Sequence, residues 1–360
     1  MGLNWDIFCR VIDNFGDIGV AWRLARDLTE RGETVRLWLD DASALQWMAA
    51  GEAMPAGISV RRWEDSLNEA EVGDVVIETF GCELPEPFVA RMVTCIKPPR
   101  WINLEYLSAE PYVERSHGLS SPQFSGPGRG LTKQFFYPGF TARTGGLLRE
   151  PGLLAEQSRF DAQAWLARLG DRQIERRPGE RIVSLFAYAN PALPDLLAAL
   201  ATEPTLLLVC PGAAQAQLFE LQCTQKLPTA NLRWQALPYL SQPEYDCLLW
   251  ACDLNFVRGE DSFVRAQWAG RPFVWQIYPQ HDGAHGPKLE AFLALYLADC
   301  DADLAQQTGS LWRGWNGLVT WDGALPELSA SGAQALKWRE HLTSQLDLTT
   351  QLLGLAYKSS

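Results

Sequence analysis

The sequence predicts an α/β protein made of two doubly wound halves that face one another across a cleft. Short apolar runs of strand length alternate with segments in which apolar residues recur at helical spacing. This alternation fades after Pro111 and restarts at Arg181, and 360 residues suffice for two domains of common size. Strands that alternate with helices form parallel sheets, so we expect one such sheet in each half.

Four apolar runs in the first half predict buried strands. The first run precedes a helix that ends near Arg31-Gly32, where glycine suits the C-cap. Residues 111–138 are rich in Gly, Pro and Ser and predict a long functional or mobile loop. The predicted strands are 7–12, 34–39, 74–79 and 100–107.

The second half repeats the pattern after a charged stretch at 171–180, which is the candidate linker. Ser241 and Glu244 predict a capping box at the start of a helix, and Gly270 ends the next helix. We therefore place one Rossmann-like domain at 1–170 and a second at 180–332, with a C-terminal helix at about 335–360 that packs back on the first. The predicted strands are 181–187, 205–210, 232–237, 253–257 and 272–277, and the predicted helices are 193–200, 241–251 and 263–269.

Composition excludes several classes of protein. Hydrophobic residues make up 47% of the chain and charged residues 21%, as in soluble globular proteins. A formal charge of −12 argues against general binding to nucleic acid or to an anionic membrane, and no apolar run is long enough to span a bilayer. The eight cysteines form no CxxC pair, which favours buried free thiols in a reducing cytoplasm.

The first strand-to-helix turn, from Cys9 to Gly19, is the most informative segment. Such turns lie at the sheet edge where α/β folds bind ligands, and their glycines normally admit a phosphate. This turn instead carries Asp13 and Asp17, which would repel a phosphate. The pair predicts either a general base with an orienting partner, acting on a cation, or ordinary helix capping.

Arg258 to Ser262 forms the corresponding turn of the second half. Gly259 permits a tight bend, Ser262 can cap the next helix, and Arg258 offers a fork suited to phosphate oxygens. Capping alone would explain Glu260, Asp261 and Ser262 about equally well. The position at the end of a strand favours an anionic ligand, with the two carboxylates directed to hydroxyls or backbone amides.

Other sites receive less support. Asp40 follows Gly19 at the spacing of a ribose-binding acid, but the turn lacks GxGxxG and Asp17 would lie at the pyrophosphate, so a nicotinamide site is rejected. Phe186 and Tyr188 could stack on a base or could be ordinary packing residues. His281 and His285 have helical metal-site spacing, but the intervening Asp-Gly argues against a helix, so no metal site is predicted.

With both turns in view, the chain resembles the protein-arginine rhamnosyltransferases that modify translation elongation factor P. The resemblance runs essentially from end to end. It is most specific at 13–19 (DNFGDIG), at 103–108 (NLEYLS), at 258–267 (RGEDSFVRAQ) and at 278–280 (YPQ).

The resemblance implies a GT-B fold, dTDP-β-L-rhamnose as donor, inversion at the anomeric carbon, no cofactor and no required metal. It implies that Asp13 and Asp17 are catalytic, and we assign the base to Asp17. A loop that contacts donor or acceptor is implied at Asn14, Phe15, Gly16 and Tyr106. The implied donor-binding residues are Phe186, Tyr188, Gln242, Tyr245, Arg258, Glu260, Asp261 and Ser262.

The implied reaction fits the charges. An arginine guanidinium is protonated at neutral pH, and a carboxylate pair can orient it and accept its proton. The first domain would then bind elongation factor P, which the modification activates for translating polyproline stretches, and the second would bind the nucleotide sugar. The alternatives are a GT-B transferase with another sugar or acceptor, and a nucleotide-sugar-binding protein without catalysis.

Overall fold

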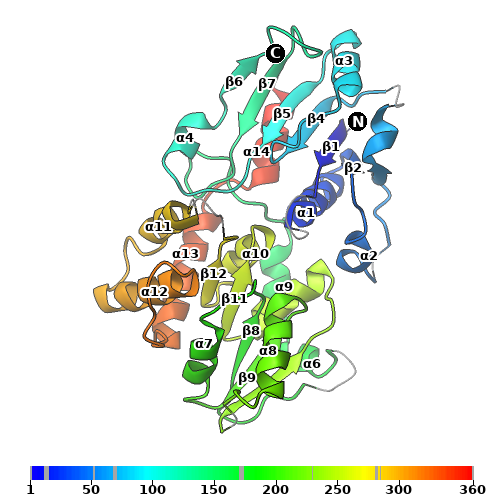
Figure 1. Ribbon diagram of the computed structural model, residues 1–360. Helices are drawn as coiled ribbons and strands as arrows, with labels where there is room; N and C mark the ends of the chain where they lie inside the picture. The colour runs from blue at the N-terminus through cyan, green and yellow to red at the C-terminus, as the bar shows by residue number, and fades with distance from the viewer. Residues whose placement is uncertain are drawn as a thin grey trace. The chain divides into compact units, whose positions relative to one another are not determined.

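A computed structural model of the chain describes residues 2–11, 16–51, 53–67, 71–169, 174–228, 230–279, 283 and 285–358. Two compact units are present. Unit 1 comprises Met1–Glu150 together with Leu342–Ser360, and unit 2 comprises Pro151–His341. Each unit contains one mainly parallel sheet covered by helices (Figure 1).

Within the described residues, unit 1 holds a seven-stranded sheet in the order β3-β2-β1-β4-β5-β7-β6. All neighbouring strands are parallel except the edge strand β6, which pairs antiparallel with β7. The strands are β1 (Asn4–Cys9), β2 (Thr34–Leu39), β3 (Ile58–Arg62), β4 (Val75–Thr79), β5 (Arg100–Leu104), β6 (Ser120–Pro122) and β7 (Thr132–Phe136). The helices are α1 (Gly16–Glu30), α2 (Leu45–Met48), the 3-10 helix η1 (Trp63–Leu67), α3 (Glu86–Thr94), α4 (Tyr112–Ser116) and α14 (Leu348–Tyr357).

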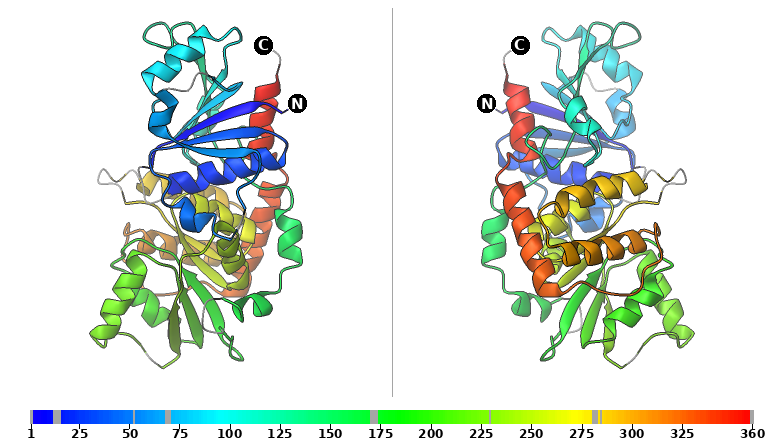
Figure 2. Two further views of the ribbon diagram at one scale, coloured as in Figure 1. Left: turned by 90° about the vertical axis from the view of Figure 1, so that its right-hand side faces the viewer. Right: turned by 90° about the vertical axis from the view of Figure 1, so that its left-hand side faces the viewer.

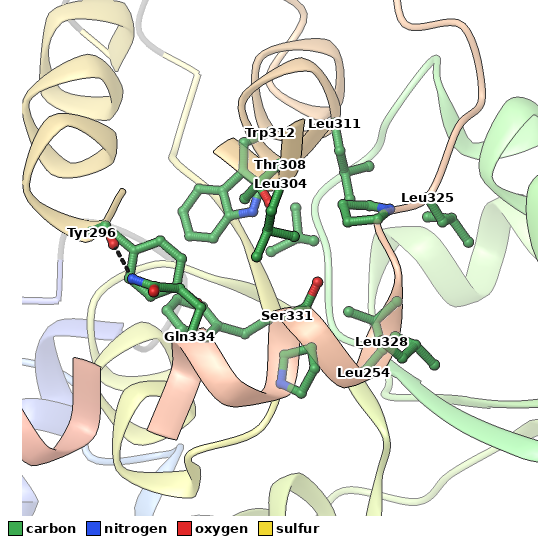
Figure 3. A pocket seen from close by; sticks show the side chains of 14 residues that line it. Leu254, Tyr296, Leu304, Thr308, Leu311, Trp312, Leu325, Leu328, Ser331 and Gln334 are labelled. Atoms are coloured by element: carbon green, nitrogen blue, oxygen red, sulfur yellow. Dashed lines mark hydrogen bonds between the residues drawn. The ribbon is translucent and has the colours of Figure 1, made fainter. Parts of the chain in front are cut away.

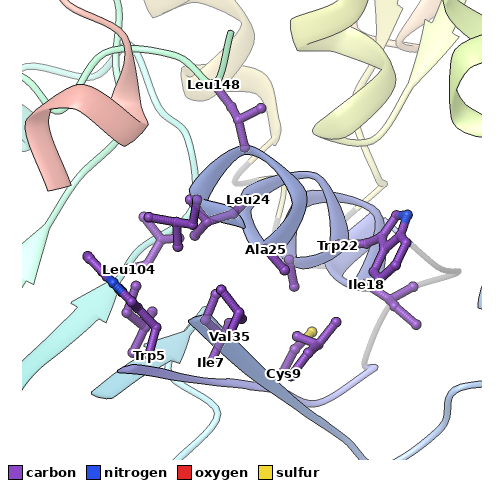
Figure 4. Packing of buried hydrophobic residues seen from close by; sticks show 14 of the residues in the cluster. Trp5, Ile7, Cys9, Ile18, Trp22, Leu24, Ala25, Val35, Leu104 and Leu148 are labelled. Atoms are coloured by element: carbon purple, nitrogen blue, oxygen red, sulfur yellow. The ribbon is translucent and has the colours of Figure 1, made fainter. Parts of the chain in front are cut away.

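Alternation along β1 places side chains in two cores, one on each face of the sheet. Ile7 and Cys9 pack under α1, whereas Phe8 packs on the opposite face with the side chains of α3. Figure 4 shows the first of these cores, in which apolar side chains of α1 meet those of the strands. Residues buried on both faces explain why the strand reads as a nearly continuous apolar run.

The C-terminal helix α14 completes unit 1. Leu352 is fully buried in the core under α1, and Tyr357 Oη donates a hydrogen bond to Glu33 at 2.8 Å. Arg31 Nη2 binds Asp347, the N-cap of α14, at 2.9 Å. The helix therefore lies beside the first strands of the chain, as the side views of Figure 2 show.

Unit 2 holds a five-stranded parallel sheet within its described residues, in the order β10-β9-β8-β11-β12. Its strands are β8 (Arg181–Leu185), β9 (Thr205–Val209), β10 (Leu232–Ala236), β11 (Leu254–Arg258) and β12 (Phe273–Gln276). Its helices are α5 (Leu153–Ser158), α6 (Ala162–Leu166), α7 (Leu193–Leu200), α8 (Ala213–Cys223), α9 (Gln242–Ala251), α10 (Asp261–Ala269), α11 (His285–Tyr296), α12 (Ala302–Trp315) and α13 (Leu328–Thr343).

Two predicted helix ends in unit 2 are confirmed, the start of α9 and the end of α10. Ser241 caps α9 through a capping box, in which its backbone N and its Oγ both bind Glu244 Oε2 at 2.8 Å. Gly270 ends α10 with φ 62°, a left-handed conformation that glycine adopts without strain.

The predicted loop at 111–138 is wrong. This segment contains α4, β6 and β7, and β7 extends the parallel sheet beside β5. The strand was missed because Thr132–Phe136 lies near the sheet edge, half-buried, and its polar residues do not form an apolar run. The strand β3 and the helix α8 were also not predicted.

The structure divides the chain differently from the predicted boundaries. Residues 151–169 belong to unit 2, where Leu166 and Leu169 join an apolar core with Ile182 and Leu248. The single helix expected near the C-terminus is two helices, α13, which lies almost entirely in unit 2, and α14 in unit 1. Apolar packing of α6 on α9 accounts for the earlier boundary.

A small apolar cavity of about 20 Å³ lies in unit 2 under α12 and α13 (Figure 3). Its lining includes Leu254 and Phe273, which lie at the amino ends of β11 and β12. It therefore lies at the edge of the sheet opposite to the one at which parallel sheets bind ligands. In the described part of the chain, no helix combines the length and the apolar character needed to cross a membrane.

Candidate functional site

The carboxyl ends of the parallel strands carry the predicted site residues in both units. In unit 1, Asp17 lies on the first turn of α1, the helix that comes next after β1 in the chain, and is 5% exposed. Its charge contributes to raising the pKa of the Cys9 thiol, although burial is the main cause, so the carboxylate lies close to the end of β1. Asp13, Asn14 and Phe15 lie outside the described residues.

Asp40 has a structural role at this edge. Its Oδ1 accepts a hydrogen bond from the backbone N of Val11 at 2.9 Å, so it holds the chain as it leaves β1. This use of the carboxylate agrees with rejecting Asp40 as a ribose ligand. Gly16 needs no positive φ, and a Cβ added there would meet no described atom within 4 Å.

Aromatic side chains flank the ends of β4 and β5. Tyr106 is 37% exposed and stacks on Phe80, with ring centroids 4.4 Å apart and planes at 16°. Phe80 has φ 57°, which costs roughly 1–3 kcal/mol for a residue with a side chain. Tyr106 thus lies just beyond the carboxyl end of β5, partly exposed and packed on Phe80.

In unit 2, three predicted donor-binding residues meet at the ends of β8 and β11. The guanidinium carbon of Arg258 lies 4.4 Å from the ring centre of Phe186 and 4.5 Å from that of Tyr188. Cation–π contacts of this type contribute about 0.5–2 kcal/mol each. Arg258 is therefore held at the sheet edge by two aromatic rings, with a positive charge beside a π surface.

The backbone geometry of the turn after Arg258 accounts for its glycine. Gly259 has φ 64°, its carbonyl accepts a hydrogen bond from Trp275 Nε1 at 2.8 Å, and an added Cβ would lie 3.6 Å from Tyr188 Oη. Ser262 does not cap α10 as expected. It is the second residue of the helix, and its Oγ accepts from the backbone N of Arg258 at 3.2 Å and also binds the Arg258 carbonyl.

Glu260 is the N-cap of α10, and Asp261 is its first residue. Both side chains thus lie at the N-terminal end of the helix, where backbone N–H groups and the helix dipole favour an anionic ligand. Arg258 and the start of α10 form the positive part of this edge.

The helix α9 brings the last two predicted residues to the same region. Gln242 is its first residue and is buried, and the ring of Tyr245 contacts that of Phe186 at 5.6 Å. Burial raises the pKa of Tyr245 well above its ordinary value, with the Cys210 and Asp261 charges adding to the effect, so the hydroxyl stays neutral.

A buried ion pair joins α9 to α10. Arg265 Nε and Nη2 bind Asp246 Oδ1 and Oδ2 at 2.9 and 2.7 Å, and the two side chains are 2% and 7% exposed. A bidentate pair of this kind fixes the two helices relative to one another. It therefore fixes Tyr245 relative to Ser262.

Two further residues of this edge had no role predicted from the sequence, although Tyr278 lies in the YPQ segment of the resemblance. Gln276 Oε1, at the end of β12, accepts the backbone N–H of Tyr188 at 2.8 Å, and Tyr278 packs against the Tyr188 ring at 5.3 Å. The available signal was a buried glutamine that ends an apolar strand. Such a polar residue at the carboxyl end of a parallel strand is a candidate site residue.

Comparison with known proteins identifies the family. The model for elongation factor P (EF-P) rhamnosyltransferase EarP matches residues 5–357. The chain belongs to the EarP family. It is 45% identical to a protein-arginine rhamnosyltransferase of Pseudomonas aeruginosa, over 97% of this chain and 98% of that one, and 45% identical to one of Pseudomonas putida over the whole of both chains.

Solved structures agree. A structure from work on EarP-mediated arginine glycosylation of translation elongation factor EF-P matches with a TM-score of 0.68 and 34% identity, over 99% of this chain and 100% of that one. The spinosyn rhamnosyltransferase SpnG matches at 14% identity with a TM-score of 0.55, over 98% of this chain and 99% of that one, which shows the shared fold. The predicted GT-B fold class is confirmed, and the EarP-family chain is an enzyme, a glycosyltransferase.

Proposed function

We propose that this enzyme transfers L-rhamnose from dTDP-β-L-rhamnose to one arginine side chain of elongation factor P in the cytoplasm. The observation that carries the proposal is the stacking of Arg258 on Phe186 and Tyr188 beside the start of α10, in a chain of the EarP family. All eight cysteines lie among the described residues and are free thiols, which supports a reducing compartment.

The donor would bind at the carboxyl edge of unit 2. Phe186, Tyr188 and Tyr245 offer ring surfaces for the thymine and the deoxyribose. Arg258 and the N–H groups at the start of α10 would bind the diphosphate, because both present donors to an anion. Glu260 and Asp261 would accept hydrogen bonds from sugar hydroxyls, and the amide of Gln242 would donate or accept one.

The acceptor arginine would bind at the carboxyl edge of unit 1, where Asp17 is described. A guanidinium is a weak nucleophile because it is protonated and its lone pairs are delocalised. As one guanidinium nitrogen forms a bond to C1 of rhamnose, the bond from C1 to the diphosphate oxygen breaks and the departing electron pair leaves with dTDP. Asp17, oriented with Asp13, would take the proton released from that nitrogen.

Attack from the face opposite the leaving group would invert the anomeric carbon. Charge on the leaving diphosphate would be stabilised by Arg258 and by the helix N-terminus, so we propose a reaction that needs neither a metal nor a cofactor. Activation of elongation factor P for polyproline translation is the expected consequence.

The test is intact-mass spectrometry of elongation factor P incubated with the enzyme and dTDP-β-L-rhamnose. We expect a gain of one deoxyhexose on a single arginine, located by fragmentation. UDP- and GDP-linked sugars, compared as donors, check the nucleotide, and NMR of the product checks inversion. Binding of dTDP-rhamnose without transfer would point to another acceptor, and tighter binding of another nucleotide sugar would exclude the proposed donor.

A further inference from the structure

A second carboxylate of unit 1 lies at the ends of β5 and β7, away from the turn that carries Asp17. Glu105 follows β5 directly, and its backbone N donates to the carbonyl of Phe136 at 2.9 Å, so the strand pairing continues to this residue. In the sheet order, β4 separates β5 from β1. Two strand spacings place Glu105 about 10 Å from the end of β1.

Among the residues that the structure describes, no cation forms an ion pair with Glu105. Among the described residues, its carboxylate accepts one hydrogen bond, from Asn103 Nδ2 at 2.6 Å. The nearby cation Lys133 is bonded to the buried Glu78 and lies 4.5 Å from the ring centre of Trp101. Burial raises the pKa of Glu105, and the charge of Glu78 adds to that increase, although the hydrogen bond from Asn103 and the charge of Lys133 lower it in part.

Asn103 presents a second unused acceptor beside it. The side chain is 4% exposed, and within the described structure its buried Oδ1 has no hydrogen-bonding partner. The amide orientation is determined by Glu105, because the reverse orientation would place two acceptors against each other. A buried acceptor without a donor costs about 1–3 kcal/mol, so a group that supplies the donor would be stabilised there.

Tyrosine rings flank the two acceptors. Tyr112 and Tyr137 lie edge to face, with ring centroids 5.9 Å apart. Tyr137 directly follows Phe136, whose carbonyl binds the backbone N of Glu105, so the two rings lie near the end of β5. Burial raises the pKa of both phenols, and the next contribution is the charge of Glu110 for Tyr112 and that of Glu105 for Tyr137. Tyr112 is 40% exposed, which leaves ring surface accessible to a cation.

We propose that Glu105 and Asn103 form a subsite for a cationic side chain of the acceptor protein, a Lys or Arg other than the arginine that is modified. The inference rests on the proposed function. Two adjacent acceptors flanked by aromatic rings require a group that only donates, and the guanidinium and ammonium groups are the side chains with that property. Because the subsite is separated from the end of β1, it would bind a second residue of the acceptor and not the modified arginine. Binding of that second residue would position the acceptor protein on the enzyme and so select one arginine for modification.

The test is Glu105→Gln, which keeps the size of the side chain and removes its charge. We expect KM for elongation factor P to rise at least about ten-fold, because a charge-assisted hydrogen bond is lost. The kcat at saturating acceptor and KM for dTDP-rhamnose should stay unchanged, and the Tm should not fall. The matched control is Glu114→Gln on α4, whose carboxylate already binds Thr141 Oγ1 at 2.7 Å and pairs with Arg143, and it should leave KM unchanged.

Alanine scanning of the lysines and arginines of elongation factor P locates the partner. One substitution should weaken binding to the wild-type enzyme by the same factor and have no further effect on the E105Q enzyme. An unchanged acceptor KM in E105Q, or a fall in kcat alone, overturns the subsite.

Direct titration of elongation factor P separates this inference from the proposed function, because it needs no transfer. Tight binding to the wild type and weaker binding to E105Q, without any rhamnose transfer, would support the subsite while the proposed reaction fails. Equal binding to both proteins overturns the subsite even when transfer occurs, and absence of binding to the wild type overturns both.

Discussion

The carboxyl edges of the two sheets carry different charged groups on the same framework. In unit 1 the described polar groups of this edge include the carboxylates of Asp17 and Glu105, and aromatic rings lie beside them. In unit 2 the edge adds a cation, since Arg258 lies against aromatic rings beside the start of α10, where Glu260 and Asp261 also lie. A parallel sheet thus supplies the position, and the few residues after each strand decide whether a cation or an anion binds there.

The largest effect is expected for Asp17→Asn, which tests whether the carboxylate edge of unit 1 is catalytic. Transfer to elongation factor P should fall about 10²–10⁴-fold, the usual contribution of a general base, while affinity for dTDP-rhamnose stays unchanged. Rates come from mass spectrometry and donor affinity from calorimetry. Asp41→Asn is the control, since Asp41 follows β2 at the same edge, is exposed and binds the backbone N of Ser43. Normal transfer by D17N would show that the negative edge is not catalytic.

A second prediction compares buried ion pairs in the two units. Asp246→Asn should lower the free energy of unfolding by about 3–5 kcal/mol, because it leaves the buried Arg265 without its counter-charge. Asp6→Asn should also be destabilising but by less, because Arg36 is 15% exposed and water can partly solvate it. Asp6 binds Arg36 Nε and Nη2 at 2.7 Å within the first sheet. Only D246N should also weaken donor binding, because its partner Arg265 fixes α10. Urea denaturation and donor titration check this, and equal donor affinity in both variants would contradict it.

The next effect is expected for Arg258→Lys, which keeps the charge and removes the planar fork. Donor affinity should fall about ten- to hundred-fold, with acceptor affinity unchanged. Arg271→Lys, at an exposed position between α10 and β12, is the matched control and should bind donor normally. Calorimetry with dTDP measures both variants. If R258K bound donor as the wild type does, stacking and fork geometry would have no part in the site.

The smallest effect concerns pH. The pKa of Glu105 is raised by burial, so its carboxylate takes up a proton at a higher pH than an ordinary glutamate does. KM for the acceptor should therefore rise as pH falls through that raised pKa. The rise should be no larger than the increase in KM caused by E105Q at neutral pH. The acceptor KM of E105Q itself should not show this pH-dependent rise. The sign for folding is opposite. A raised carboxyl pKa means that the folded state binds the proton more tightly, so this group's contribution to stability improves as pH falls.

Features that depend on neighbouring residues in the chain could be predicted from the sequence, whereas features that depend on tertiary contacts could not. The bounds of β2 and α7 were predicted residue for residue, and the capping box of α9 follows from two residues three apart. The turn at Arg258 was found because it follows an apolar run and carries charge. No role was predicted for Glu105, because its part in a binding site depends on two tertiary contacts. Its carboxylate binds the amide of Asn103, and Lys133 pairs with Glu78 and not with Glu105.

The return of the chain to unit 1 through α14 has a consequence for biosynthesis. Unit 2 is one continuous segment, whereas the core of unit 1 needs Leu352, near the end of the chain. During translation, unit 2 can fold while unit 1 still lacks its last helix. A nascent chain of which residues up to 347 have left the ribosome should therefore display a protease-resistant second unit and an unfinished first one, so that unit 1 matures after unit 2.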